Sequence, residues 1–363
     1  MEHDWQAFRE GLLAWYRPDR RPMPWKENTD PYRIWLSEII LQQTRVEQGW
    51  PYFERFVAAY PTVGELAAAP DDAVMKLWEG LGYYSRARNL LRAARTVTAE
   101  HDGRFPDTYA GLLALPGIGP YTAAAIASFA FDRQVAVLDG NVFRVLARYA
   151  GDATPTTTGP GRKHFQQLAE RALGDTPAAR FNQAIMDFGA LVCTPKLADC
   201  AHCPLATSCR ALAEEKVYAL PLKKRKTAVR TRYFHYLVIK DEQERYLLEQ
   251  RPAGDIWQSL YQFPLVEAER IDLSLPRLTA HPNWPADLAP DPLRHMRRSG
   301  VYRHQLSHQT IGAVFHVLSV GDLTAPAYPP SGMLVVPRAE FERYALPRII
   351  TRFLEDTSLT LGF

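Results

Sequence analysis

The sequence of 363 residues lacks any apolar run close to the ~20 residues that a helix needs to cross a bilayer. Its first residues, Met1 to Trp5, are too charged for a secretory signal, and cysteines are absent outside one short window near residue 200. The net charge of +3 is too small to indicate a nucleic-acid partner by itself. We therefore expect a cytoplasmic protein with no membrane partner, long enough for two domains with separate cores.

The four cysteines form the pattern C-x6-C-x2-C-x5-C, at Cys193, Cys200, Cys203 and Cys209. A disulfide framework would be spread across a domain in an oxidising compartment, and nothing else in the sequence suggests secretion. Four thiolates can instead hold a tetrahedral zinc ion or a 4Fe-4S cluster. Zinc ribbons usually pair two C-x2-C knuckles, whereas this loop contains one. The spacing therefore favours the cluster, with zinc as the alternative.

One stretch, which begins at Pro31, places an acid where a charged group is costly. Asp30 can cap a helix whose first residue is Pro31. At helical spacing Ile34 and Leu41 share the face of Glu38, so the Glu38 carboxyl is predicted to be partly desolvated. Burial raises the pKa of a carboxyl, which suits a general acid near neutral pH. The ordinary alternative is a glutamate at a helix edge that pairs with a neighbouring arginine.

A second acid, Asp139, ends an apolar extended run that starts at Gln134 and precedes a helix. Its ordinary role would be to cap that helix. Its functional role would be a second carboxylate near Glu38, because paired acids cleave glycosidic bonds: one protonates the leaving group and the other stabilises the cationic sugar. The sequence alone does not show that the two acids meet.

Two glycine-containing turns are candidates for contact with DNA. Gly80 to Tyr84 is an aromatic turn into a helix studded with arginines, Arg86 among them, and it suits a wedge with phosphate contacts. Gly117 and Gly119 form a G-x-G turn between two helices, where backbone N–H groups can face a phosphate. The alternatives are a solvated basic face and an ordinary helix–helix turn.

Hydrophobic spacing predicts a helical N-terminal region and a C-terminal domain of α+β type. Residues 216–232 between them carry seven basic side chains and no acid, which is typical of a linker along a phosphate backbone. Helices are expected over 5–16, around Glu38, and over 51–59, 63–69, 71–79, 85–95, 109–113, 123–127 and after 139. Strands are expected over 233–239, 246–250, 261–266, 311–320 and 333–336, with helical stretches over 340–344 and 349–355.

Several motifs occur together in a specific order. They are L-S-E-I-I-L-Q-Q-T-R-V, G-L-G-Y-Y-S-R-A-R-N-L, L-P-G-I-G-P-Y-T-A, V-L-D-G-N-V, F-N-Q-A-I-M-D-F-G-A and the four-cysteine loop. Over most of residues 20–215 this series resembles the A/G-specific adenine DNA glycosylases of the MutY type, in the helix-hairpin-helix DNA glycosylase superfamily. The C-terminal part resembles the Nudix-like recognition domain of that family more weakly, through residues 257–265 and 303–309.

The resemblance implies a mainly α helix-hairpin-helix glycosylase domain with a 4Fe-4S cluster loop, followed by an α+β Nudix-like domain. Residues 1–212 would form the catalytic region, with a six-helix lobe at about 29–135 and an iron-sulfur lobe built from the N-terminal helix and 136–212. Residues 213–231 would be the basic linker, and residues 232–363 the lesion-recognition domain.

The resemblance also implies removal of adenine mispaired with 8-oxoguanine or guanine, after the base is flipped out of double-stranded DNA. The protein would act as a monomer at the nucleoid. In the catalytic roles that it implies, Glu38 protonates the adenine, and Asp139, supported by Asn141, stabilises the oxocarbenium-like sugar.

The resemblance implies DNA contacts as well. Gln43 and Tyr83 would fill or wedge the duplex, and Gln183 would touch the flipped base. Gly117 and Gly119 would lie on the DNA backbone. The cluster would be held by Cys193, Cys200, Cys203 and Cys209.

One position bears on the type of reaction. Related endonuclease III proteins use a lysine in this hairpin to form a Schiff base and then nick the strand, and Tyr121 stands at that position here. The resemblance therefore implies a monofunctional glycosylase that leaves an abasic site.

The C-terminal loop is expected to read the lesion. Ser307 and His308 can hydrogen-bond to it, whereas Leu306 stands where the family often has phenylalanine. The C-terminal domain lacks the Nudix hydrolase box of clustered glutamates, so we do not expect it to hydrolyse nucleotides.

Two other functions stay open at this point. An endonuclease III-like enzyme that acts on oxidised pyrimidines is disfavoured by Tyr121 and by the extra domain. A non-enzymatic iron-sulfur protein that binds DNA or senses redox state would leave Glu38 and Asp139 without a role.

Overall fold

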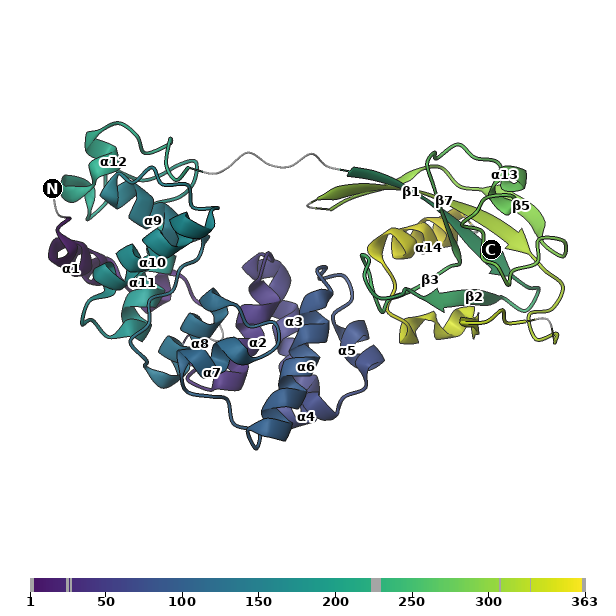
Figure 1. Cartoon of the computed structure of the whole chain (residues 1–363), viewed down its shortest axis with the longest axis horizontal. Helices are drawn as coiled ribbons and strands as arrows, with labels where there is room; N and C mark the ends of the chain where they lie inside the picture. Colours follow the sequence, from purple (N-terminus) through teal and green to yellow (C-terminus); the bar gives the residue numbers. More distant parts are fainter. Residues whose placement is uncertain are drawn as a thin grey trace. The chain divides into compact units, whose positions relative to one another are not determined.

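The computed structural model describes residues 3–23, 26, 28–222, 230–306, 308–326 and 328–360, with side chains up to residue 356. It divides into two compact units, one made of residues 1–68 and 89–225 and the other of residues 69–88 and 226–363. Helices occupy the first part of the chain and strands the last part (Figure 1). The predicted combination of a mainly α region and an α+β domain is confirmed.

Residues 69–88 group with the C-terminal unit, although the sequence-based boundary at residue 212 keeps them in the helical region. The Nη1 atom of Arg88 donates to the carbonyl oxygen of Gln258 at 2.7 Å, and the backbone N–H of Leu346 donates to the Glu79 carboxylate at 2.8 Å. Contacts between residues so far apart in sequence leave no local pattern from which they could be predicted.

The described elements up to residue 213 are helices. They are α1 (Trp5–Trp15), η1 (Pro18–Arg20), α2 (Pro31–Leu41), α3 (Val46–Ala59), α4 (Val63–Ala68), α5 (Asp71–Leu77), α6 (Ser85–Glu100), α7 (Tyr109–Ala114), α8 (Pro120–Phe131), α9 (Gly140–Ala150), α10 (Gly159–Leu173), α11 (Ala178–Leu191), η2 (Ala206–Ser208) and α12 (Arg210–Ala213).

The helix that carries Glu38 begins where its cap predicts. The Asp30 carboxylate accepts a hydrogen bond from the Tyr32 N–H at 3.0 Å, and Pro31 is the first residue of α2. The expected start of α3 at Pro51 is wrong, because the Arg45 carbonyl already accepts the first backbone hydrogen bonds and the helix begins at Val46. Helices α10 and α11 were not delimited from the sequence.

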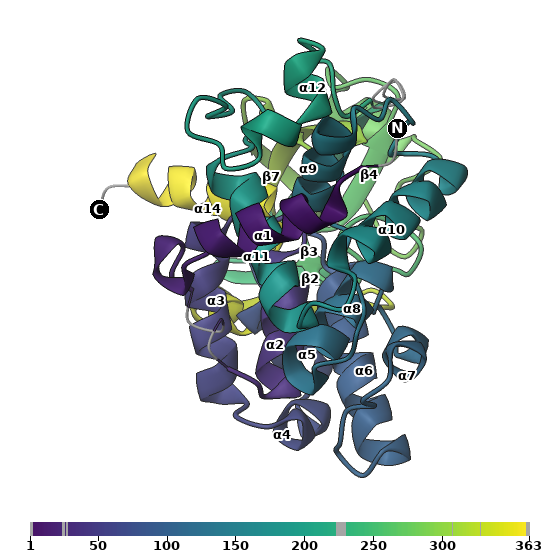
Figure 2. The same cartoon turned by 90° about the vertical axis from the view of Figure 1, so that its left-hand side faces the viewer.

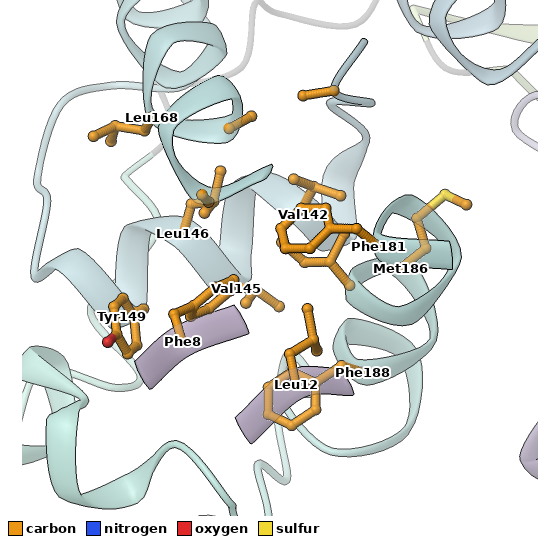
Figure 3. Packing of buried hydrophobic residues seen from close by; sticks show 14 of the residues in the cluster. Phe8, Leu12, Val142, Val145, Leu146, Tyr149, Leu168, Phe181, Met186 and Phe188 are labelled. Carbon is orange, nitrogen blue, oxygen red and sulfur yellow. The ribbon is translucent and has the colours of Figure 1, made fainter. Parts of the chain in front are cut away.

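Helix α1 packs across α9 and α11, as Figure 2 and the ring contacts both show. The Phe8 ring lies 4.6 Å from the Tyr149 ring of α9, centroid to centroid, and the Trp15 ring lies 5.2 Å from the Phe188 ring of α11. Figure 3 shows Phe8 and Leu12 directed into this core. Each fully buried side chain of this size stabilises the fold by roughly 1.5–3 kcal/mol. This core holds α9 against α11, the two helices that carry several candidate site residues.

The C-terminal unit contains one mixed sheet. Its elements are β1 (Arg230–Lys240), β2 (Arg245–Gln250), β3 (Tyr261–Gln262), β4 (Leu265–Ala268), α13 (Leu275–Thr279), β5 (Arg294–Arg298), β6 (Tyr302–Gln305), β7 (Gln309–Ser319), β8 (Met333–Pro337), η3 (Arg338–Arg343) and α14 (Arg348–Thr360). The strand order is β3-β2-β1-β7-β5, with β4 also paired to β1, β6 to β7 and β8 to β2. The central strands β1 and β7 run parallel, and the other pairs are antiparallel.

Different helices pack against the two faces of this sheet. On one face Phe315 of β7 stacks on Phe353 of α14, with ring centroids 3.9 Å apart. On the other face Leu237 of β1 and Leu318 of β7 join a core that includes Leu278 of α13. The alternation of side chains along each strand separates these two sets.

The expected strands are only partly correct. Strand β7 begins at Gln309, two residues earlier than expected, and β1 extends from Arg230 to Lys240. The strand expected over 261–266 is two strands, because Pro264 has no N–H to continue the ladder. Strands β5 and β6 and helix α13 were missed. Residues 223–229 of the expected basic linker lie outside the described residues.

Candidate active site

A cavity of about 880 Å³ lies in the first unit. Its walls come from the segment between α1 and α2, from α2 itself, and from α8, α9 and α11. Six of the predicted site residues line it: Glu38, Gln43, Tyr121, Asp139, Asn141 and Gln183. The fold therefore brings together two acids that are far apart in the sequence, in a space within the size range of small-molecule sites.

Glu38 projects from α2 into this cavity. The pKa of its carboxyl is raised to about 7, mainly by burial and to a lesser extent by the charge of Asp139. A hydrogen bond from the Tyr121 hydroxyl and the charge of Arg21 act in the opposite direction. The desolvation expected from helical spacing is present. At neutral pH the carboxyl is thus protonated in a substantial fraction of molecules, which is the state that a general acid requires.

Asp139 caps α9 and also lines the cavity, so its two predicted roles are compatible. One carboxylate oxygen accepts hydrogen bonds from the N–H groups of Asn141 at 2.8 Å and Val142 at 2.7 Å. The other accepts a hydrogen bond from the Asn141 side chain at 2.8 Å. Burial raises the pKa of Asp139, and these three donors act in the opposite direction because they favour the anion.

Asn141 is fixed between an acceptor and a donor. Its Nδ2 atom donates to Asp139, and its Oδ1 atom accepts from the Nη2 atom of Arg144 at 2.8 Å. The same guanidinium donates to the carbonyl oxygens of Gly189 and Cys193. Arg144 was missed in the sequence, although its position one helical turn after Asn141 was a signal.

Gly189 allows α11 to approach α9 at this point. A Cβ atom at Gly189 would lie 2.7 Å from the Cβ atom of Asn141, closer than real Cβ atoms come to their neighbours. This close packing is part of what positions Asn141.

Tyr121 reaches into the cavity from α8. Its hydroxyl donates a hydrogen bond to Glu38, and the same oxygen lies 3.5 Å from the sulfur atom of Met186. Burial and the two nearby acids raise the pKa of the phenol well above its usual value. Tyr121 is therefore a neutral donor at physiological pH, and it offers no amine for a Schiff base.

The helix–hairpin–helix turn is only partly explained by its glycines. Gly117 has φ +75°, a conformation that favours glycine, and it lies on the surface. Gly119 has φ −90°, which any residue adopts, and it precedes Pro120 at the start of α8. Its lack of a side chain leaves the backbone open to close approach.

The second group of predicted residues is in the other unit. Tyr83 and His308 line a cavity of about 580 Å³, which also includes Arg232 and Trp257. Tyr83 has φ +48° and is 49% exposed, so a bulky side chain is held out in a strained turn. Ser307 lies outside the described residues.

Arg86 is buried rather than exposed. Its Nη2 atom donates to the Gly82 carbonyl oxygen at 3.1 Å, and its guanidinium lies over the rings of Trp78 and Tyr83. Burial lowers the pKa of Arg86 to about 10. These contacts hold Arg86 within the aromatic turn, and its predicted contact with a phosphate stays a prediction.

The four cysteines line one small cavity between α9, α11 and the loop before α12. The Nη1 atom of Arg148 donates to the sulfur atom of Cys193 at 3.4 Å. Burial raises the pKa of the Cys203 thiol to about 11, so metal binding there has to displace protons. Within the described ranges, no group of three or more His, Cys, Asp or Glu side chains is arranged to hold a metal ion.

None of the described helices is both long and apolar enough to span a membrane.

Comparison with known proteins gives the family. Residues 36–171 match the model of the HhH-GPD superfamily base excision DNA repair protein, and residues 235–356 match that of the NUDIX domain. The adenine DNA glycosylase of Buchnera aphidicola subsp. Baizongia pistaciae is 36% identical over 263 residues, which cover 71% of this chain and 73% of that protein. The chain belongs to the adenine DNA glycosylases.

A second relative agrees with this assignment, and two solved structures are similar in fold. The adenine DNA glycosylase of Rattus norvegicus is 43% identical over 230 residues, covering 60% of this chain and 45% of that protein. A thermostable thymine-DNA glycosylase aligns with a TM-score of 0.54 and 29% identity, over 58% of this chain and 97% of that one. An endonuclease III–DNA covalent intermediate, with a TM-score of 0.51 and 20% identity over 59% of this chain and 99% of that one, supports the fold alone.

As an adenine DNA glycosylase, the chain is a base-excision DNA repair enzyme, and DNA is its partner. The predicted family, enzyme class, helix-hairpin-helix fold and Nudix-like domain are confirmed. A non-enzymatic DNA-binding protein is thereby set aside. The chemical roles of the individual site residues stay predictions.

Proposed function

We propose that this adenine DNA glycosylase excises adenine paired with 8-oxoguanine or guanine and leaves an abasic site. The observation that carries the proposal is the cavity shared by Glu38 and Asp139, in which burial raises the pKa of Glu38 to about 7. Cleavage of a glycosidic bond requires one protonated acid, which donates a proton to the leaving group, and one ionised acid, which stabilises the cationic sugar.

Protonated Glu38 donates its proton to a ring nitrogen of the flipped adenine. The C1′–N9 bond then breaks, and its electron pair leaves with the base. Ionised Asp139 stabilises the cationic sugar, a role that its three N–H donors support by favouring the anion. Water adds to C1′, and the Glu38 carboxylate takes up the proton that this water loses. A general acid so placed typically contributes ~10²–10⁴-fold to the rate.

We propose that the reaction stops at the abasic site. Tyr121 supplies a neutral phenol where a strand-cleaving enzyme needs an amine. Lys26 also lines the cavity, but its ammonium donates to the Asp187 carboxylate and to the carbonyl oxygens of Arg21 and Pro18. All three of its N–H groups are thus engaged, which leaves it unsuited to act as a nucleophile.

Two exposed side chains are proposed to occupy the duplex when the adenine leaves it. Gln43 and Tyr83 both have positive φ angles, +59° and +48°, in turns between helices. Backbone strain of this kind is concentrated at functional sites. Base flipping costs a few kcal/mol of unstacking, which inserted side chains can offset.

We propose that the 580 Å³ cavity of the second unit reads the base opposite the adenine. It is lined by Tyr83 and by Leu306 and His308 of the loop between β6 and β7. Arg232 forms ion pairs with Asp255 and Glu267 at this site, so the cavity wall is held by internal contacts. An exposed imidazole can donate to or accept from an oxidised purine.

The four-cysteine loop is proposed to hold a 4Fe-4S cluster. Cys193, Cys200, Cys203 and Cys209 are the donor set that such a cluster takes, and Arg148 is a cation beside their sulfur atoms. The cluster would tie this loop to α9 and α11. Iron analysis of the purified protein separates it from zinc. We also propose that the enzyme acts as a monomer at the nucleoid, where its DNA lies.

The direct test is single-turnover base excision on one duplex that carries adenine opposite 8-oxoguanine. We expect release of free adenine and an abasic site that breaks only after heat or base treatment. The control duplex carries thymine opposite 8-oxoguanine and should stay intact. Release of thymine or of an oxidised pyrimidine instead of adenine would contradict the proposal, and so would strand cleavage without treatment.

A further inference from the structure

Beneath the catalytic cavity, α11 contains a fully buried acid that plays no part in the proton transfer described above. Asp187 is 0% exposed and lies one helical turn after Gln183. The Nε2 atom of Gln183 donates to its Oδ1 atom at 3.1 Å. The segment before α2 supplies two cations to the same carboxylate: Arg21 on Oδ1 at 3.3 Å and Lys26 on Oδ2.

This contact fixes the orientation of the Gln183 amide. An ionised carboxylate accepts hydrogen bonds only, and the amide carries two donors on nitrogen and an acceptor on oxygen. If the amide turned over, its carbonyl oxygen would face the Asp187 carboxylate and meet only lone pairs. The buried ion pairs with Lys26 and Arg21 hold the carboxylate in place, because an unpaired buried charge is strongly destabilising.

The consequence lies on the cavity side of Gln183. One of the two Nε2 hydrogens is used by Asp187, and Gln183 lines the cavity. Its Oε1 atom makes no hydrogen bond to a side chain or backbone group in the part of the chain that the structure describes, so it is available as an acceptor. An acceptor at this position can bind an amino group on a base, whereas a carbonyl group there would be repelled.

We infer that Asp187 is a positioning residue that sets base specificity, by holding Gln183 so that the cavity presents an acceptor to the exocyclic amine of the flipped base. The inference rests on the proposed function, because it takes adenine as the base in the cavity. It adds a reason why the site accepts a 6-amino purine and rejects a 6-oxo purine of nearly the same shape. A site built around one hydrogen bond discriminates far better than an apolar pocket does.

The test compares three bases opposite 8-oxoguanine: adenine with a 6-amino group, hypoxanthine with a 6-oxo group, and purine with hydrogen at that position. In Asp187→Asn the new amide can donate to Gln183, so both orientations of Gln183 become possible. We expect the ratio of adenine to hypoxanthine excision to fall by about tenfold, the value of one such hydrogen bond. The rate for purine, which has no group to read, should change least.

A matched control is available on α10. The Nε2 atom of Gln166 donates to the Glu170 carboxylate at 3.3 Å with the same spacing of four residues, away from the cavity. Glu170→Gln should leave all three rates and their ratios unchanged.

Asp187→Asn removes a buried charge and can prevent folding, so a second variant keeps the inference testable. The double substitution Gln183→Glu with Asp187→Asn exchanges the two side-chain types and conserves the net charge beside Lys26 and Arg21. The introduced asparagine can then donate to the introduced glutamate, whose other oxygen still faces the cavity as an acceptor. We expect this variant to retain the preference for adenine over hypoxanthine.

The outcomes separate the inference from the proposed function. If the wild-type enzyme releases no adenine, the proposed function fails. If it releases adenine and Asp187→Asn lowers all three rates by the same factor, or the exchanged pair loses the preference, the proposed function stands and the role assigned to Asp187 is overturned.

Discussion

The Nη2 atom of Arg144 donates to the Oδ1 atom of Asn141 at 2.8 Å. The Nε atom of the same guanidinium donates to the carbonyl oxygen of Cys193 at 2.7 Å. One side chain thus connects the residue that supports Asp139 to the first cysteine of the loop. The proposed catalytic centre and the proposed cluster site are therefore parts of one hydrogen-bonded network.

This network predicts that changes at Arg144 affect catalysis at a distance. Arg144→Gln removes the guanidinium that donates hydrogen bonds to Asn141 and to the loop. We expect the rate of single-turnover adenine excision to fall by about 10–100-fold, as is typical when a supporting residue is removed. DNA affinity and unfolding should be measured alongside the rate. Arg133→Gln, on an exposed ion pair with Asp107, is the control. An unchanged rate in Arg144→Gln would show that Asn141 does not need this contact.

The packing of α11 against α9 gives a second prediction. Gly189→Ala forces the new methyl group against Asn141, where only 2.7 Å is available. We expect a loss of about 1–3 kcal/mol in the free energy of unfolding, together with slower excision because Asn141 is displaced. Gly159→Ala at the start of α10 is the matched control, since a Cβ atom there meets nothing within 4 Å. Full activity in Gly189→Ala would argue against a tightly positioned Asn141.

The rate of excision should depend on pH through Glu38. Burial raises the pKa of Glu38 to about 7, and the general acid must be protonated, so the single-turnover rate should fall as pH rises above 7. The Tyr121 hydrogen bond lowers this pKa. In Tyr121→Phe the pH above which the excision rate declines should therefore be higher than in the wild type. A decline that begins at lower pH in this variant would contradict the assignment of Glu38 as the general acid.

A buried histidine pair in the C-terminal unit predicts acid sensitivity of its fold. The Nε2 atom of His235 lies 2.8 Å from the Arg270 carbonyl oxygen and therefore carries the proton. The Nδ1 atom of His235 then accepts from the Nε2 atom of His316 at 3.2 Å. This leaves the Nδ1 atom of His316 buried, with no hydrogen-bond partner among the described residues. His235 cannot gain a proton without losing the hydrogen bond from His316, and a proton added to the Nδ1 atom of His316 would be buried with no acceptor among the described residues.

Burial, followed by the charges of His235, Arg298 and His295, lowers the pKa of His316 from 6.5 to about 3. Between these two pKa values His316 is protonated in the unfolded chain and neutral in the folded domain. The free energy of unfolding therefore decreases as pH falls below 6.5. The loss for His316 at pH 5 is about 2 kcal/mol.

Urea unfolding at pH 7.5 and pH 5 measures this loss. His316→Leu should reduce the pH dependence, whereas His101→Leu, at an exposed histidine, should leave it unchanged. Equal pH dependence in the wild type and in His316→Leu would contradict the assignment.

The parts of the fold that were predictable from sequence have local causes. The Asp30 cap, Pro31 and the apolar neighbours of Glu38 lie within a few helical turns, so the start of α2 and the desolvated acid could both be predicted. The G-x-G turn between α7 and α8 is likewise local. The assembly of Glu38 with Asp139 depended on the family resemblance, because spacing alone does not bring distant acids together.

The elements and contacts that the sequence did not predict either depend on segments that are distant in sequence or lack a hydrophobic pattern. Strand β5 is exposed along its length, so no alternation marks it. Arg86 is an arginine that the sequence suggests is at the surface, yet it is buried under an aromatic turn. The ion pair between Lys26 and Asp187 joins residues 161 positions apart, and neither side chain alone indicates it.

Single-turnover excision by Glu38→Gln tests the central claim most directly, on a duplex that carries adenine opposite 8-oxoguanine. Glutamine keeps the shape of the side chain but has no acidic proton to donate. We predict that this variant binds the duplex as tightly as the wild-type enzyme and releases adenine at least ~10²-fold more slowly. Turnover at the wild-type rate would contradict the account, because the proton would then come from another group.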